Sequence, residues 1–161
     1  MIVSVWRIDK LKWAATSFSG DGARLYGGRW NSPGHPMIYT SEHPALAALE
    51  ILVHAIPDKL LLRAYCSIEA KFDDSLLDVL PKKTLPRDWS HDPVSKSTQR
   101  LGEIWLASEE SRPVLKVPSA VVNGSFNYLI NPLHPRLRQI RIGKPKPFRF
   151  DPRLGKSSKP L

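Results

Sequence analysis

The stretch from Pro44 to Ala55 restricts the fold more than any other part of the sequence. Proline suits the first turn of a helix, and either Ser41 or His43 can cap that turn. Large apolar residues cover one broad side of the helical wheel and alanines fill much of the rest, so the helix is apolar nearly all round. The large residues are Leu46, Leu49, Leu52, Val53 and Ile56, and the alanines are Ala45, Ala47 and Ala48. We expect such a helix to be buried, which requires a fold that packs around it.

Glu50 is the charged residue that this apolar helix carries beyond its first turn, and His54 follows four residues later on the same face. A buried carboxylate needs partners, because an unpaired buried charge is costly. One interpretation is a structural ion pair with Arg7, Arg24 or Arg29. The other is a carboxylate that stabilises developing positive charge on a substrate or binds its hydroxyls. A histidine at such a position is more often a hydrogen-bonded structural residue than an acid or base.

A glycine-rich segment from Ser17 to Pro36 is predicted to be a loop, and it contains the run Gly27-Gly28-Arg29-Trp30-Asn31. Consecutive glycines let the backbone approach a ligand closely, and the forked guanidinium of Arg29 can hold a phosphate or pyrophosphate through two hydrogen bonds. The alternative is a tight turn with a solvent-exposed arginine. The glycine spacing matches neither a P-loop nor a dinucleotide-binding fingerprint.

Short strands separated by prolines dominate the rest of the chain. Alternation predicts a strand over Val3–Ile8, an apolar run predicts a buried strand over Met37–Thr40, and a helix is expected over Ser95–Glu110. The inner residues of that helix are expected to include Leu101, Ile104, Trp105 and Ala107. Further strands are expected at Leu61–Ile68, Val114–Val117, Gln139–Ile142 and Pro147–Phe150. Because strands outnumber helices, we predict an α+β fold built on a mixed or antiparallel sheet with a few helices.

The composition narrows the compartment and the partners. The 161 residues include 24 Lys and Arg against 15 Asp and Glu, a formal net charge of +9, which favours an anionic partner. Cys66 is the single cysteine, so no internal disulfide forms and no oxidising compartment is required. The N-terminal residues do not form a secretory signal and no apolar segment is suited to a membrane, so the expected location is cytoplasmic.

Several kinds of chemistry are disfavoured. Ser119 follows Pro118 without the G-x-S-x-G pattern of a hydrolase nucleophile. The five histidines lack the spacing of metal ligands, so we expect no metal. Basic residues from Arg136 to Lys159 are interrupted by prolines and form no recognition helix, which favours a solvated or partner-binding surface over a DNA reader.

Several motifs occur in an order that resembles the RES domain family. They are Phe18–Arg24, Gly27–Gly34, Ile38–Ser41, Ala45–Ala47 with Glu50, and Val117–Ala120, joined by Trp6-Arg7, by parts of Asn127–Pro135 and by Phe148–Leu154. The order Arg29, Glu50, Ser119 corresponds to the three letters that name the family. The resemblance spans essentially the whole chain, so we expect a RES domain over residues 1–154 and a polar tail over residues 155–161.

The resemblance implies a bacterial toxin that inhibits growth and has a fold similar to the ADP-ribosyltransferase toxins. Such a toxin degrades NAD+ by phosphorolysis or hydrolysis of the bond between nicotinamide and ribose. NAD+ would then be a consumed substrate rather than a cofactor, with inorganic phosphate as the co-substrate of phosphorolysis. The implied partner is an Xre-like helix-turn-helix antitoxin that blocks the active site. DNA would be contacted only through that complex, and no membrane is involved.

By the same resemblance, four residues are expected to be catalytic. Arg29, with Arg7, would bind the pyrophosphate, and Tyr39 would pack on the nicotinamide or its ribose. Glu50 would stabilise the oxocarbenium-like transition state, and Ser119 would orient the dinucleotide. The other expected substrate-binding residues are Trp30, Asn31, His54 and Asn127.

Two other functions stay open on the sequence alone. The first is transfer of ADP-ribose to a cellular protein, and the second is a non-catalytic module that binds nucleic acid or protein. The sequence does not choose among water, phosphate and protein as the acceptor, and it leaves the oligomeric state open.

Overall fold

A computed structural model describes residues 1–54 and 63–155 of the chain. Its strands are β1 (Ile2–Lys10), β2 (Ile38–Ser41), β3 (Tyr65–Asp73), β4 (Leu77–Val79), β5 (Val114–Pro118), β6 (Phe126–Ile130), β7 (Arg141–Ile142) and β8 (Lys146–Phe148). The α-helices are α1 (Asp21–Tyr26), α2 (Pro44–Leu52) and α4 (Lys96–Ala107). Short 3-10 helices are found at Leu11–Thr16, Asp74–Leu76, Lys82–Thr84, Leu137–Gln139 and Pro152–Gly155.

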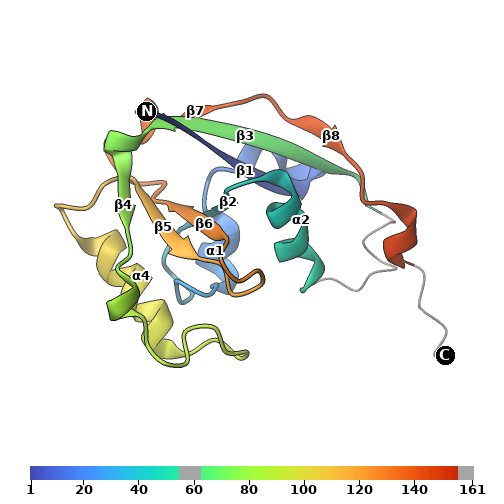
Figure 1. The fold of residues 1–161 in the computed structure, drawn as a ribbon. Coiled ribbons are helices and arrows are strands. Elements are labelled where there is room, and N and C mark those ends of the chain that lie inside the picture. Colours follow the sequence, from blue (N-terminus) through green and yellow to red (C-terminus); the bar gives the residue numbers. More distant parts are fainter. Residues whose placement is uncertain (55–62, 156–161) are drawn as a thin grey trace, which may run out of the picture.

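The strands of this region form one eight-stranded sheet in the order β4-β5-β6-β2-β1-β3-β7, with β8 also paired to β3. Every pair is antiparallel except β4 with β5. Figure 1 shows the long β1–β3 pair across the top of the molecule, β2, β6 and β5 below it, α4 at the lower left and α2 to the right of β2 and β6. The expected α+β class with a mixed sheet is confirmed.

The sheet has two parts that diverge between β1 and β2. β1 pairs with β3 along its full length, from Ile2 opposite Asp73 to Lys10 opposite Tyr65. By contrast, β1 and β2 are paired at a single position, where Trp6 lies opposite Ser41. Beyond that position the two strands separate, which lets the sheet curl and opens room for polar side chains between its halves.

Apolar side chains pack on both faces of the sheet and under α2. One group includes Val5, Ile38, Phe72, Val114 and Ile130. A second group lies between β5, β6 and α4 and contains Trp30, Met37, Trp105, Leu115, Val117 and Leu129. A third places Ala47 of α2 against Ile8, Tyr65 and Phe150. Because burial of one large apolar side chain stabilises a fold by about 1.5–3 kcal/mol, these layers fix α2 and α4 on the sheet.

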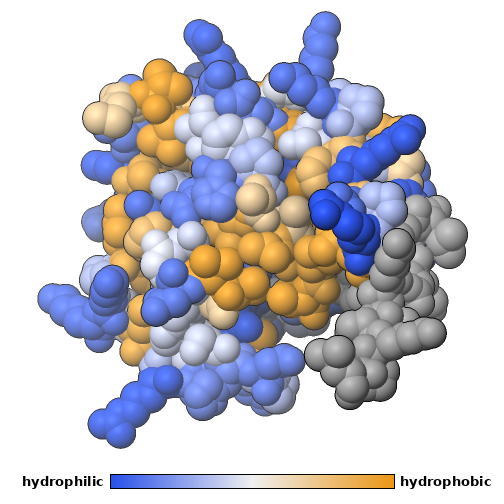
Figure 2. Space-filling model, turned by 45° about the vertical axis from the view of Figure 1, so that its right-hand side comes forward, coloured by the Kyte–Doolittle hydropathy of each residue, from blue (hydrophilic) through white to orange (hydrophobic). Residues whose placement is uncertain are grey.

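α2 begins as expected but is shorter and less buried than expected. His43 caps it by accepting a hydrogen bond from Leu46 N, and Pro44 occupies the first turn. The helix ends at Leu52, whereas Ala55, its expected end, lies outside the described residues. Leu49 and Val53 are 40% and 55% exposed, so burial on all sides was a wrong prediction. The sheet covers one side of α2 only. Figure 2 shows hydrophobic residues gathered near the middle of the face of the molecule that it draws.

Other elements begin or end at residues that differ from the expected ones. The segment Ser17–Pro36 is not a continuous loop, because α1 lies within it. The strand expected at Leu61–Ile68 is β3, which begins at Tyr65; residues 61 and 62 lie outside the described residues. The two late strands are shorter than expected, and β4 was not foreseen because it has only three residues.

α4 replaces the longer helix expected over Ser95–Glu110. Ser95 caps it by accepting a hydrogen bond from Thr98 N. Trp105 is buried as expected, whereas Ile104 and Ala107 are exposed. No helix within the two described ranges is long and apolar enough to cross a membrane. The tail expected at residues 155–161 lies outside these ranges except for Gly155.

Candidate functional site

Glu50 lies at the centre of a hydrogen-bonded group that joins α2 to the sheet. Its Oε1 accepts hydrogen bonds from Ser119 Oγ at 2.9 Å and from Asn127 Nδ2 at 2.5 Å. Ser41 Oγ in turn donates to Asn127 Oδ1 at 2.7 Å, which fixes the orientation of the amide. We call these four residues, Glu50, Ser119, Asn127 and Ser41, the Glu50 cluster.

The register of the sheet brings the cluster together. β2 and β6 pair so that Ser41 lies directly opposite Asn127, and opposed residues of an antiparallel pair point to the same face. Ser119 follows Pro118, the last residue of β5, and its hydroxyl accepts hydrogen bonds from Val121 N and Val122 N. These contacts close a turn that leaves the hydroxyl proton of Ser119 to be donated to Glu50.

The carboxylate of Glu50 is held by neutral donors rather than by a cation. Arg7 pairs with Asp9, and Arg24 pairs with Asp21. Within residues 1–54 and 63–155, Glu50 forms no ion pair, so the interpretation as a structural ion pair with an arginine does not hold for this region. No residue in the same ranges donates to Oε2. Among the described residues, one oxygen of the half-buried carboxylate is thus held by two donors and the other accepts no hydrogen bond.

Tyr39 organises the glycine-rich segment on the same face of β2 as Ser41. Its hydroxyl donates to Asn31 Oδ1 at 2.6 Å and accepts from Trp30 N at 3.0 Å. Burial raises the pKa of Tyr39 above its ordinary value, so the phenol stays protonated and can donate. A Cβ atom on Gly28 would come within 2.5 Å of the Tyr39 hydroxyl, which explains the glycine at that position.

Arg29 extends from this segment toward the loop before α4. Its Nη1 donates to the carbonyl oxygens of Trp89 at 2.8 Å and His91 at 3.0 Å. The side chain is half-buried, which excludes the freely exposed arginine of the alternative interpretation. No residue of the described ranges accepts from Nε or Nη2, and these two nitrogens are the pair suited to two hydrogen bonds with a phosphate.

Arg7 has a different environment, because each part of its guanidinium already has a protein partner. Nε donates to Ser17 Oγ, Nη1 to the Tyr39 carbonyl and Nη2 to Asp9 Oδ2, at 2.9, 3.0 and 3.1 Å. The hydrogen bond to Tyr39 spans the gap where β1 and β2 separate. Arg7 therefore has a structural role, in which it holds the backbone of β2 at Tyr39.

The remaining expected site residues divide among the cluster, the interior and the surface. Asn127 and Ser119 lie in the Glu50 cluster, whereas Trp30 and Asn31 are buried, with 2% and 0% exposure. Asn31 Nδ2 donates to three backbone carbonyls, of Ala23, Ser32 and His35, so it shapes the loop. His54 is exposed just beyond the end of α2, and the structure does not bring it into the cluster.

Sequence reasoning missed Ser41 as a member of the site. The signal was its position two residues after Tyr39 in a strand, which places both side chains on one face. Ser41 had no predicted role in the site: it was a candidate helix cap, a position that His43 occupies instead, and the last residue of the motif Ile38–Ser41.

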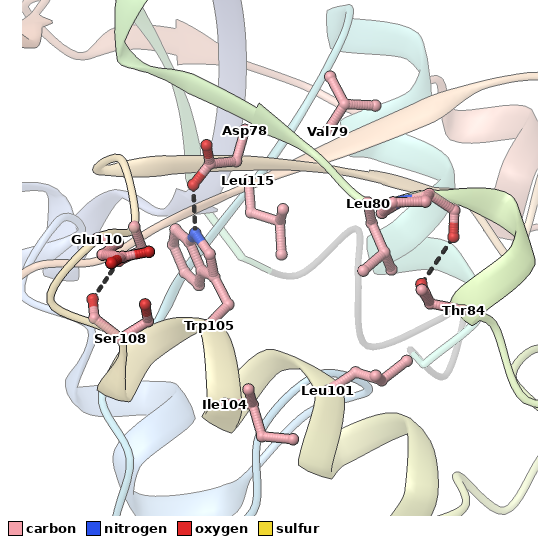
Figure 3. A pocket seen from close by; sticks show the side chains of 12 residues that line it. Asp78, Val79, Leu80, Thr84, Leu101, Ile104, Trp105, Ser108, Glu110 and Leu115 are labelled. Atoms are coloured by element: carbon pink, nitrogen blue, oxygen red, sulfur yellow. Dashed lines mark hydrogen bonds between the residues drawn. The ribbon is translucent and has the colours of Figure 1, made fainter.

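A separate cavity of about 430 Å³ lies between β4, β5 and α4. Figure 3 shows Leu101, Ile104 and Trp105 of α4 on one side of it, with the Trp105 indole donating to Asp78. None of the expected site residues lines this cavity. In the described part of the chain, no three His, Cys, Asp or Glu side chains gather as a metal ion would require.

Comparisons with known proteins identify the family of this chain. A family model described as RES domain matches residues 4–151. Toxin Res of Yersinia enterocolitica is 38% identical over 151 residues, covering 93% of this chain and 98% of that protein. Toxin Res of Photorhabdus laumondii is 34% identical over 156 residues, covering 96% and 99%. A protein of Sphingobium sp. named Prs ADP-ribosylating toxin is 35% identical over 159 residues, covering 96% and 98%.

A crystal structure of the M. tuberculosis MbcT–MbcA toxin–antitoxin complex contains a chain of the same fold. The TM-score is 0.69 at 20% identity, over 96% of this chain and 87% of that chain. This structural likeness shows a shared fold, whereas the family is shown by the family model and the sequence relatives. The chain belongs to the RES domain family and, by its likeness to full-length relatives, to the toxins of that family.

Proposed function

We propose that this toxin depletes NAD+ by cleaving the bond between nicotinamide and ribose. The observation that carries the proposal is the Glu50 carboxylate, which two neutral donors hold by one oxygen while no described residue donates to the other. A carboxylate preorganised in this way stabilises positive charge that develops beside it. The neighbouring Tyr39 supports a loop whose Arg29 has donors suited to a pyrophosphate.

The chemistry of the step fits the charge of the site. The bond between the ribose C1 and the pyridinium nitrogen breaks, and its electron pair leaves with nicotinamide, which becomes neutral. Positive charge then spreads over C1 and the ring oxygen of the ribose. Oε2 of Glu50 would accept a hydrogen bond from a ribose hydroxyl while the carboxylate offsets this charge. Water or inorganic phosphate forms the new bond to C1, and an attacking water loses its proton to solvent.

The proposal assigns the cluster members distinct tasks. Ser119 and Asn127 hold Glu50 in place rather than orient the dinucleotide directly, because both side chains already donate to the carboxylate. Arg29 binds the pyrophosphate, and Arg7 supports the strand that carries Tyr39. Trp30 and Asn31 act through the loop that they stabilise.

We further propose that an antitoxin, of the Xre-like helix-turn-helix class, restrains the toxin in the cytoplasm, where NAD+ is available. The fold shared with a chain of the toxin–antitoxin complex supports an antitoxin partner. The exposed Leu49 and Val53 on either side of Glu50 in the sequence offer apolar surface close to the site. DNA would be contacted through the antitoxin.

A second candidate function is transfer of ADP-ribose to a protein. The relative from Sphingobium sp., 35% identical to this chain, is named for ADP-ribosylation. Both functions break the same glycosidic bond and differ in the acceptor at C1.

The products distinguish these functions. Purified protein is incubated with NAD+ in phosphate-free buffer, with added inorganic phosphate, and with a bacterial extract, and the products are separated by chromatography. Nicotinamide with ADP-ribose means hydrolysis, and nicotinamide with an ADP-ribose phosphate means phosphorolysis. If nicotinamide is released only with extract, and a protein band becomes labelled, the function is modification of a protein rather than depletion of NAD+.

A further inference from the structure

Three residues on one side of α4 contact the loop that carries Arg29. Gln99, Gly102 and Glu103 are spaced three and four residues apart, so they lie on one face of the helix. The sequence motifs discussed above include none of them. All three contact the backbone or a hydroxyl of the segment from Gly28 to Ser32.

The two polar residues form four hydrogen bonds with this segment. Gln99 Nε2 donates to the carbonyls of Gly28 at 3.0 Å and Asn31 at 3.1 Å. Glu103 Oε1 accepts from Ser32 N at 2.9 Å and Ser32 Oγ at 2.6 Å. The Glu103 side chain is 12% exposed, and the Ser32 hydroxyl holds the pKa of this carboxyl below its ordinary value. Glu103 is therefore an ionised, firm acceptor for the loop.

Gly102 lets the helix approach closely enough for these bonds. A Cβ at this position would lie 1.9 Å from the Trp30 carbonyl oxygen, a contact that the backbone cannot accommodate. On its other side, the loop is held by the Tyr39 hydroxyl, which accepts from Trp30 N. The backbone on both sides of Arg29 is thus fixed between β2 and α4.

We propose that Gln99 and Glu103 are positioning residues that act through Arg29 and set the affinity of this site for the pyrophosphate of its substrate. This inference rests on the proposed function. Arg29 uses Nη1 to hold the carbonyls of Trp89 and His91, so its orientation depends on where the loop places its backbone. Without the contacts from α4, the two remaining nitrogens would lose the geometry that a bidentate phosphate contact requires.

The kinetic test compares the wild type, Arg29→Ala, Glu103→Ala and the double variant by their KM for NAD+ and kcat. Glu103→Ala is expected to raise KM about tenfold, the equivalent of about 1.4 kcal/mol, with kcat changed less than threefold. In the Arg29→Ala background the same substitution should change KM less than twofold, because residues acting through one group are not additive. Glu103→Gln keeps an acceptor oxygen for Ser32 and should restore KM to within about threefold of the wild type.

Ile104→Ala is the matched control. Ile104 is exposed, lies on the same helix, and lines the separate cavity in Figure 3. Should Glu103→Ala not fold, Gln99→Ala takes its place in the cycle. A folded Glu103→Ala with wild-type KM, or an equal rise in KM in both backgrounds, would overturn the inference.

A binding measurement separates this inference from the proposed function. Wild-type protein that releases no nicotinamide in buffer, with phosphate or with extract refutes NAD+ cleavage, and the same cycle is then measured as the affinity for inorganic pyrophosphate by calorimetry. A tenfold loss in Glu103→Ala that vanishes in the Arg29→Ala background supports the positioning role. Unchanged affinity in folded Glu103→Ala refutes it.

Discussion

At the scale of single residues, the site depends on how neutral donors hold one carboxylate. Asn127 is the link between Glu50 and Ser41, since its amide donates to the carboxylate and accepts from the hydroxyl. An amide can do both at once, whereas an ionised carboxylate can only accept. This is the physical reason for an asparagine at the centre of the cluster.

Asn127→Asp tests that reason with almost no change in shape. The new carboxylate cannot donate to Glu50 and repels it, so the cluster should separate. We expect nicotinamide release to fall at least about tenfold at neutral pH, in line with the loss of one preorganised hydrogen bond. Steady-state rates with NAD+ measure the effect, and thermal unfolding checks that the variant is folded. Wild-type activity in the folded variant would show that this hydrogen bond is dispensable.

Tyr39→Phe tests the buried hydroxyl that holds the glycine-rich loop. The substitution leaves Asn31 Oδ1 and Trp30 N without their partner, which should cost about 1–3 kcal/mol of unfolding free energy. Burial raises the pKa of Tyr39 in the folded state, so its contribution is fully present below the ordinary pKa of about 10 and is lost as the pH rises above it. Urea unfolding at pH 8 and pH 10.5 should show a smaller alkaline loss in the variant. Equal stability of the two proteins at pH 8 would contradict this assignment.

At the scale of elements, α4 is set apart by how closely it approaches the loop. An ordinary helix contact is made by side chains, but here the backbone of the helix at Gly102 lies against the backbone of Trp30. The glycine at position 102 of α4 thus has a geometric reason that the apolar periodicity of the helix did not reveal.

Two glycine substitutions should change stability in opposite directions. Gly102→Ala forces a Cβ into the Trp30 carbonyl and should destabilise the fold by about 1–3 kcal/mol or more. Gly22→Ala in α1 meets nothing within 4 Å and should stabilise by about 0.4–1 kcal/mol, because alanine loses less chain entropy in a helix. Chemical denaturation of both variants measures the difference. An unaffected Gly102→Ala would mean that α4 does not hold the loop closely.

At the scale of the whole molecule, local patterns predicted the elements better than the contacts between them. The strands β1, β2 and β5, the start of α2 and the body of α4 follow from alternation, apolar runs and caps. The short helix α1 was missed because glycines flank and interrupt it, and β4 was too short to give a pattern. The exposure of Leu49 and Val53 depends on which side of α2 the sheet covers, which the helical wheel does not contain.

For the candidate site, the sequence predicted which residues to consider better than it predicted how they are arranged. Glu50, Ser119 and Asn127 were named, but their contacts join residues 69 and 77 positions apart and depend on the β2–β6 register. The glycine run was interpreted as a place where the backbone approaches a ligand. In the structure Gly28 lies against the Tyr39 hydroxyl, and the neighbouring Trp30 and Asn31 are buried rather than open to a ligand.

The central claim is that Glu50 is required to break the nicotinamide–ribose bond. The most direct measurement is nicotinamide release from NAD+ by purified wild type, by Glu50→Gln, and by Glu109→Gln, in which an exposed carboxylate outside the cluster is removed. Glu50→Gln should release nicotinamide at least about 100-fold more slowly, while Glu109→Gln should match the wild type. A folded Glu50→Gln protein that releases nicotinamide at the wild-type rate would contradict the account.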